Sequence, residues 1–283
     1  MAEIKTLVDD VYKLFDPNEG HVPNEDNLSN FAENLKGLLR ERLAKREPLN
    51  NPLRFSSLGK QDRQLWYMAK GYPQEDLSAK TYFKFLYGDV IEQLLLFLVK
   101  ESGHDVTMPQ AEVCVDGVKG HIDAVIDGVL VDVKSASPYG YKKFVMNTVT
   151  EDDTFGYTQQ LSGYAQVVTP GQAPAWLAMD KVSGALCVTT LSQSIVKEYP
   201  VDERITHLKE VIAKEEPPAR CYPDEEDGKS GNRKLGTGCG YCAFKFTCHP
   251  ELRAFAYSNG PRFLTKVVKT PDVPEVTESF QTK

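Results

Sequence analysis

The stretch Gly120-His-Ile-Asp-Ala-Val-Ile-Asp-Gly-Val-Leu-Val-Asp-Val-Lys134 predicts a β-hairpin around which the rest of the chain is organised. Two short apolar runs rich in β-branched residues, 122–126 and 129–133, flank the dipeptide Asp127-Gly128. That dipeptide is a strong signal for a tight turn between antiparallel strands. The hairpin is therefore the first element that the sequence predicts.

Charged residues lie inside this apolar hairpin. Alternation along the second strand places Asp132 and Lys134 on one face, with Val131 and Val133 on the other. Asp123 lies near the start of the first strand, so both carboxylates can reach the lysine at one end of the hairpin. Charged groups on buried strands are costly unless they pair or hold a metal ion. A stabilising ion pair and a metal site are the two interpretations.

The hairpin belongs to a longer series of motifs. Gly120-x-x-Asp123, a turn and Asp132-x-Lys134 resemble the core of the PD-(D/E)XK nuclease superfamily. Upstream, Gly88-Asp-Val-Ile-Glu92 resembles the G-x-x-x-E motif of the RecB-like and phage-exonuclease branch. The motifs occur in the order typical of that branch, which strengthens a signature that is loose on its own.

Two downstream motifs extend the resemblance. Gln160-Leu-Ser-Gly-Tyr164 is similar to the Q-x-x-x-Y helix of that branch, with Tyr157 one turn earlier. Cys239, Cys242 and Cys248, spaced C-x2-C-x5-C, resemble the cysteines of RecB-family nucleases that carry an iron–sulfur cluster. The resemblance covers the chain from about residue 53 to residue 250.

The resemblance implies a restriction-endonuclease-like α/β fold, in which helices flank a mixed central sheet. It also implies a Mg2+ site, at which Mn2+ can substitute, with ligands from Glu92, Asp123, Asp132 and the carbonyl of Val133. Lys134 is expected to position or deprotonate the attacking water. Gln160 and Tyr164 are expected to support the lysine, the metal or the DNA backbone.

Glu92 is also singled out by its surroundings. The segment 80–100 predicts a helix with a broad apolar surface, and Glu92 falls within that apolar stretch. An unpaired carboxylate there is penalised, and a metal or lysine partner relieves the penalty.

Basic and aromatic residues around these motifs are candidate DNA contacts. Arg54 and Arg63 precede the long helix and can contact phosphate, although surface salt bridges are an equal alternative. The segment 139–144 interleaves aromatics with lysines, as in single-strand binding, or is an exposed loop with ordinary lysines. The full set of candidate DNA contacts is Arg54, Arg63, Ser135, Lys142, Lys143 and Tyr157.

The cysteines predict a second, structural metal site. In the relatives the fourth cluster ligand is an N-terminal cysteine, where this chain has Lys60, Gln61 and Asp62, so Cys221 is expected to replace it. The resemblance favours a [4Fe-4S] cluster, and four thiolates equally suit tetrahedral Zn2+. His249 is a reserve ligand, whereas Cys114 and Cys187 lie in strand-like runs as inert thiols.

Composition limits the setting. The hydrophobic fraction of 41% and charged fraction of 26% are ordinary for a soluble protein. No apolar run approaches the roughly 20 residues of a membrane span. A cytoplasmic location in a bacterium or a phage-infected host follows. The net charge of −7 differs from that of many nucleic-acid-binding proteins, which have a broad basic surface.

Four regions are expected along the chain. They are an N-terminal helical region at 1–52, a nuclease core at 53–216, a cysteine metal-binding module at 217–252 and a mobile tail at 253–283. Within the core, further helices are expected at 154–168 and 201–213, with strands at 104–108, 110–118, 120–126, 129–134, 175–179 and 185–191.

The predicted function is that of a Mg2+-dependent DNA nuclease. An exonuclease acting on ends in recombination, repair or DNA degradation is favoured, with sequence-independent DNA binding and a recombination or replication protein as a conceivable partner. One alternative is a nucleic-acid-binding metalloprotein with a catalytically silent nuclease core. Another is a purely structural metalloprotein.

Overall fold

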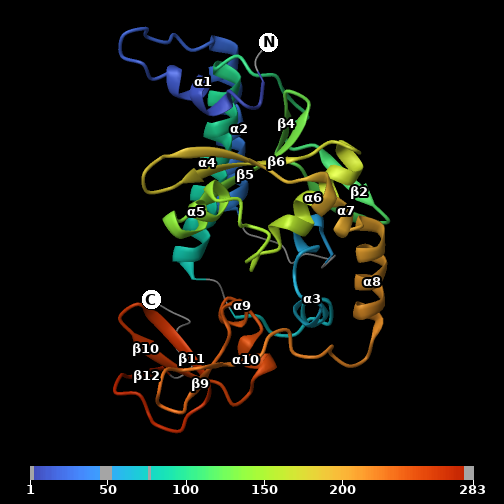
Figure 1. Cartoon of the computed structure of the whole chain (residues 1–283), viewed down its shortest axis with the longest axis vertical. Coiled ribbons are helices and arrows are strands. Elements are labelled where there is room, and N and C mark those ends of the chain that lie inside the picture. The colour runs from blue at the N-terminus through green and yellow to red at the C-terminus, as the bar shows by residue number, and fades with distance from the viewer. Residues whose placement is uncertain (1–2, 45–52, 76–77, 277–283) are drawn as a thin grey trace. The chain divides into compact units, whose positions relative to one another are not determined.

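The computed structural model describes residues 3–44, 53–75 and 78–276 of the chain (Figure 1). The chain divides into two compact units, the first formed by Met1–Gly59 and Tyr82–Ile205 and the second by Lys60–Thr81 and Thr206–Lys283. This division differs from the four expected regions, because the segment after residue 59 belongs with the C-terminal part of the chain. Among the described residues, no helix is long and apolar enough to cross a membrane.

A five-stranded sheet forms the centre of the first unit, in the order β1-β4-β5-β6-β7. Its strands are β1 (Val106–Thr107), β4 (Ala124–Ile126), β5 (Val129–Ala136), β6 (Ala175–Asp180) and β7 (Leu186–Thr190). Strands β5 and β6 are parallel, whereas the other neighbours are antiparallel. The expected α/β class with a mixed sheet and flanking helices is therefore confirmed.

The predicted hairpin is present as β4 and β5. Asp127 and Gly128 both have positive φ angles, 49° and 80°, as the tight turn requires. The Asp127 carboxylate also accepts a hydrogen bond from the backbone N–H of Asp105 and lies 2.6 Å from Nδ1 of His104. The turn is thus anchored as well as tight.

The predicted strand at 120–126 is divided in two. Its first half belongs to β3 (Val118–His121), which pairs with β2 (Glu112–Val115) in a separate two-stranded sheet. The chain then leaves the extended ladder at Ile122 and Asp123 before β4 begins. This break places Asp123 outside both ladders.

Helices cover the first unit's sheet and lead into its strands. They are α1 (Leu7–Lys13), α2 (Glu25–Leu43), the 3-10 turn η1 (Phe55–Ser57), α4 (Ala79–Glu101), α5 (Pro138–Val145), α6 (Tyr157–Val168) and α7 (Gln193–Glu198). Helix α8 (Val201–Ala213) begins in the first unit and continues into the second. The expected helices at 80–100, 154–168 and 201–213 are confirmed as α4, α6 and α8.

Helix α5 occupies the segment for which an exposed loop was one expectation. Ser137 caps it by accepting a hydrogen bond from the backbone N–H of Gly140, and Pro138 takes the first helical position. Both are standard helix-start signals.

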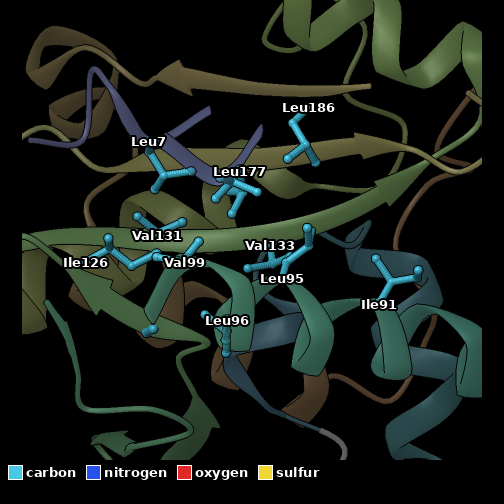
Figure 2. Packing of buried hydrophobic residues seen from close by; sticks show 12 residues of the cluster. Leu7, Ile91, Leu95, Leu96, Val99, Ile126, Val131, Val133, Leu177 and Leu186 are labelled. Atoms are coloured by element: carbon cyan, nitrogen blue, oxygen red, sulfur yellow. The ribbon is translucent and has the colours of Figure 1, made fainter. Parts of the chain in front are cut away.

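The core of the first unit lies between α1, α4 and the sheet (Figure 2). Val131 and Val133 of β5 are buried there beside Leu95 and Val99 of α4. Full burial of each such side chain contributes about 1.5–3 kcal/mol. Because the valines are committed to this core, the alternate residues of β5 must face the other way.

The second unit contains a further five-stranded sheet, in the order β12-β10-β11-β9-β8. Its elements are α3 (Asp62–Ala69), β8 (Glu225–Glu226), β9 (Arg233–Lys234), α9 (Thr237–Gly240), α10 (Lys245–Cys248), β10 (Arg253–Tyr257), β11 (Gly260–Lys266) and β12 (Glu275–Val276).

The expectation of a mobile tail from residue 253 is wrong for residues 253–276, while 277–283 lie outside the described residues. Strands β10 and β11 form an antiparallel hairpin, with Tyr257 paired to Gly260 across Ser258-Asn259. Phe255 and Leu264, one from each strand, are fully buried. These apolar side chains hold the hairpin in a folded core.

Candidate active site

The catalytic residues predicted on β5 are in direct contact. Nζ of Lys134 donates a hydrogen bond of 2.7 Å to Oδ1 of Asp132 and lies 2.6 Å from its Oδ2. Asp123 reaches across from the break before β4, and its Oδ2 accepts a 2.7 Å hydrogen bond from the backbone N–H of Val133. The two aspartates and the lysine therefore meet at one end of the hairpin, as the sequence predicted.

Glu92 enters this group from α4, one residue after Ile91 in the apolar core. Burial, followed by repulsion from Asp123 and Asp132, raises the pKa of Glu92 to about 8. Burial and repulsion from Asp132 likewise raise the pKa of Asp123 to about 7. The three carboxylates thus feel one another across the site.

One lysine serves these three carboxylates. Burial acts to lower the pKa of Lys134, but attraction from Asp132 and Asp123 outweighs it and raises the pKa above its ordinary value. Ionisation of all three acids would leave the site with more negative charge than its lysine offsets, a condition that a divalent cation relieves.

Helix α6 contributes the supporting residues. Its start is fixed by Asp153, whose carboxylate accepts hydrogen bonds from the backbone N–H groups of Tyr157 and Thr158. The ring of Tyr157 lies 5.0 Å from Nζ of Lys134. Gln160 and Tyr164 hydrogen-bond to each other through their side chains. The predicted helix face therefore does lie beside Lys134.

Gly120 allows this arrangement by leaving out a side chain. The Tyr164 ring stacks on Phe55 of η1, with ring centroids 4.7 Å apart. A Cβ atom on Gly120 would collide with the Tyr164 hydroxyl and with Cβ of Phe55. The glycine of the G-x-x-D motif thus serves close packing next to the site.

A cleft of about 840 Å3 opens onto these residues. Glu92, Asp123, Gln160 and Tyr164 line it, whereas Asp132 and Lys134 do not. Arg54 and His121 are further lining residues. His121 was not placed in the catalytic set by sequence reasoning, and its exposed side chain is a cleft residue.

Helix α2 forms one wall of the cleft and runs antiparallel to α4. The Asn27 amide donates a 2.7 Å hydrogen bond to Glu101, Phe31 stacks on Phe97, and Nε of Arg42 lies 2.6 Å from Asp89. No described residue of α2 is fully buried. The sequence predicted this helix only as part of an N-terminal helical region at 1–52 and gave no sign of its place in the cleft.

Gln110 is another residue that sequence reasoning missed. Its amide donates a 2.6 Å hydrogen bond to Oε1 of Glu92 from the loop before β2. Its φ angle of 54° is rare for a residue other than glycine, so the backbone is held in an unusual form. A loop glutamine carries no sequence signal that would single it out.

The donor set suits Mg2+ in kind, because hard divalent cations prefer carboxylate and carbonyl oxygens. Within residues 3–44, 53–75 and 78–276, no three His, Cys, Asp or Glu side chains are arranged to hold a metal ion as they stand. Asp132 is engaged by Lys134, and Glu92 by Gln110.

The four predicted cysteine ligands all belong to the second unit, but among the described residues they are not arranged as a group that could hold a metal ion as it stands. Sγ of Cys248 accepts a 3.1 Å hydrogen bond from Nε of Arg63. The sulfur of Cys221 accepts hydrogen bonds from the backbone N–H groups of Arg63 and Gln64. The sulfurs of Cys239 and Cys242 accept from the backbone N–H groups of Tyr222 and Phe244, in that order. Burial, then repulsion from the other three cysteines, raises the pKa of Cys239 to about 11.

The hydrogen bonds to these sulfurs bear on whether the four cysteines suit a thiolate-bound metal. Each of the four sulfurs has an N–H donor, as metal-bound thiolates commonly do, so the donor set fits Zn2+ or an iron–sulfur cluster in kind. His249 adds to this, since both ring nitrogens are buried and, among the described residues, have no hydrogen-bond partner. Cys114 is exposed on β2, and Cys187 lies on β7 of the first unit.

The predicted DNA contacts are spread over both units. Arg54 lines the cleft, and Ser135 follows Lys134 on β5. On α5, Lys142 is exposed, whereas Lys143 pairs with Asp152 at 2.6 Å. Arg63 lies in the second unit, where its guanidinium also donates to the Pro218 carbonyl and the Tyr67 hydroxyl. That use of Arg63 was not predicted.

Comparisons with known proteins find little similarity to this chain. No protein-family model matches it, and no curated protein matches it. Among solved structures, the crystal structure of SSO0001 is similar over 76% of this chain and 93% of that one, with 15% identity and a TM-score of 0.40. The function must therefore be argued from the site.

Proposed function

We propose that the protein is a Mg2+-dependent DNA nuclease of the PD-(D/E)XK type, acting on DNA ends. The observation that supports this most is the meeting of Glu92, Asp123, Asp132 and Lys134 beside a cleft. When bound, Mg2+ would polarise the scissile phosphate and lower the pKa of a water molecule. Sequence-independent DNA binding in the cytoplasm of a bacterial or phage-infected cell completes the proposal.

The chain's own residues have distinct tasks in this reaction. Glu92 and Asp123 line the cleft and would hold the cation together with Asp132 and the Val133 carbonyl. Lys134, oriented by Asp132, would position the attacking water and offset charge that builds on the phosphate. Gln160 and Tyr164 would keep the cleft side of the site in place.

The cysteine module has a structural task in this proposal. A [4Fe-4S] cluster, or alternatively Zn2+, bound by Cys221, Cys239, Cys242 and Cys248 would tie α9 and α10 to the start of α3. Metal binding would then contribute directly to the folding of this unit.

Digestion of end-labelled DNA tests the function. Wild-type protein should degrade DNA with Mg2+ or Mn2+ and not in EDTA. Lys134→Ala should lower turnover at least about a hundredfold, because charge stabilisation in the transition state is lost. Lys119→Ala is the matched control, because this lysine pairs with Glu112 at the surface of β3. Near-normal turnover by Lys134→Ala would exclude this active site.

A second candidate is a nucleic-acid-binding protein with a silent nuclease core. It is favoured by the engagement of Asp132 by Lys134 and of Glu92 by Gln110, which leaves no assembled metal site among the described residues. Binding of DNA with no cleavage in the presence of any divalent cation tested would support this candidate.

A further inference from the structure

One stripe of α2 faces the cleft with uncharged residues. Asn27, Asn30, Asn34 and Gly37 recur at helical spacing, and all four line the cleft. Asparagine is a modest helix former, and glycine within a helix costs about 1 kcal/mol relative to alanine. A helix that only covered α4 would gain stability from other residues at these positions.

The amides of this stripe are largely unused within the protein. Asn27 donates to Glu101. Asn30 and Asn34 are exposed, and their side chains make no hydrogen bond in the part of the chain that the structure describes. Gly37 faces open space, since a Cβ atom there would meet nothing within 4 Å. The stripe thus offers hydrogen-bonding groups and room along the cleft.

Charge limits what can lie against this wall. On α2, Glu33 pairs with Lys36 and Arg42 pairs with Asp89. Glu41, one turn after Gly37, also lines the cleft and has no cationic partner among the described residues, so a phosphate backbone along this stripe would be repelled. Arg54, by contrast, precedes Phe55, which stacks on Tyr164 next to the catalytic residues. A nucleic-acid strand would therefore turn its phosphates toward Arg54 and its bases toward α2.

We propose that α2 is the base-contacting wall of the cleft. The amides of Asn30 and Asn34 hydrogen-bond to the edges of nucleobases, and Gly37 leaves space for a base. Because a side-chain amide both donates and accepts, it suits any of the four bases, and contact need not impose a sequence. This inference rests on the proposed function and specifies how the substrate of that site is oriented.

Two fluorescent oligonucleotides of equal length test it, oligothymidylate and a strand of abasic nucleotides, with binding measured without added Mg2+ or Mn2+ so that no metal-dependent cleavage occurs. Asn30→Ala combined with Asn34→Ala should weaken oligothymidylate binding roughly 5- to 50-fold, the effect of two lost hydrogen bonds. Binding of the abasic strand should not change. Equal losses on both strands, or a loss on neither, would overturn the inference.

Gly37→Leu supplies an independent test that does not depend on lost hydrogen bonds. Thermal unfolding should occur at the same or a higher temperature, because leucine is the better helix former and meets open space. Oligothymidylate binding should nevertheless fall at least about tenfold, since part of the base's space is filled. Ala32→Leu, at an exposed position of α2 that does not line the cleft, should leave binding unchanged. Unchanged binding by Gly37→Leu would overturn the inference.

Failure of the inference and failure of the proposed function give different results. If the wild-type protein cleaves DNA but the α2 variants bind both oligonucleotides as tightly as the wild type does, only the proposed base-contacting role of α2 is excluded. If the protein binds oligothymidylate more tightly than the abasic strand, the α2 variants weaken that binding, and no divalent cation supports cleavage, only the nuclease function is excluded. If wild-type protein binds neither strand, both are excluded.

Discussion

Glu92 lies between an apolar helix surface and two aspartates, so its ionisation is coupled to folding. Its pKa of about 8 in the folded protein exceeds the ordinary value near 4.5. The folded state therefore binds the proton more tightly than the unfolded state. This contribution to stability is present at low pH and is lost as the pH rises from about 4.5 to 8.

Glu92→Gln should remove this loss. In EDTA, the variant should gain stability over wild type as the pH rises, by roughly 1–3 kcal/mol above pH 8 and by little near pH 5. Chemical denaturation across this pH range measures the difference. Glu198→Gln, at an exposed position of α7 that does not line the cleft, is the control. If the difference in stability between Glu92→Gln and wild type does not depend on pH, the inference that burial and neighbouring carboxylates raise the pKa of Glu92 is wrong.

At the residue scale, the sequence identifies groups that bear chemistry but not the neutral residues that hold them. Asp123, Asp132 and Lys134 were predictable because charge inside an apolar hairpin is conspicuous. Gln110 was not, since its contact with Glu92 depends on a loop conformation with positive φ. The packing role of Gly120 likewise requires knowing that Tyr164 and Phe55 meet there.

Among the elements, α6 lies beside the strand β5 that carries Asp132 and Lys134, and in the proposed nuclease it supports them. Gln160→Ala should lower turnover by about 10- to 100-fold, less than loss of a carboxylate, because it removes a partner of Tyr164 and no charge. Tyr164→Phe should act in the same direction. Steady-state kinetics measures both, with Gln159→Ala on the same helix as control. Wild-type turnover in both Gln160→Ala and Tyr164→Phe would reduce α6 to a scaffold.

Elements with strong local signals were predictable from sequence. The β4–β5 hairpin, α4, α6 and α8 each carry a turn dipeptide or a clear apolar period. The hairpin of β10 and β11 was not predicted, although it contains the turn dipeptide Asn259-Gly260, because the whole tail from residue 253 was expected to be mobile. The role of α2 was missed because a helix's own sequence does not specify what lies across a cleft from it.

At the scale of the whole molecule, the cysteine module determines whether the second unit has a metal. Cys221→Ser should lose metal and lower the unfolding temperature, as Cys239→Ser should, because a structural site needs all its ligands. Cys114→Ser and Cys187→Ser should retain metal. Elemental analysis and visible absorbance of anaerobically purified protein measure this, with brown protein for iron and colourless protein for zinc.

His249 gives the outcome that would contradict this ligand set. Its buried ring nitrogens lack hydrogen-bond partners among the described residues, so it is the substitute ligand that the structure offers. Full metal content in Cys221→Ser, together with metal loss in His249→Ala, would replace Cys221 by His249.

The parallel pairing of β5 with β6 has a consequence for biosynthesis. Val131 pairs with Ala175 and Ala136 with Asp180, so β5 gains its second neighbour only after the crossover through α5 and α6 has been made. Until then a nascent chain exposes the edge of an apolar, β-branched strand, which is the kind of edge that recruits other chains into aggregates. A ribosome-bound fragment that ends before residue 175 therefore already contains Asp123, Asp132 and Lys134 but still lacks the complete sheet that buries them.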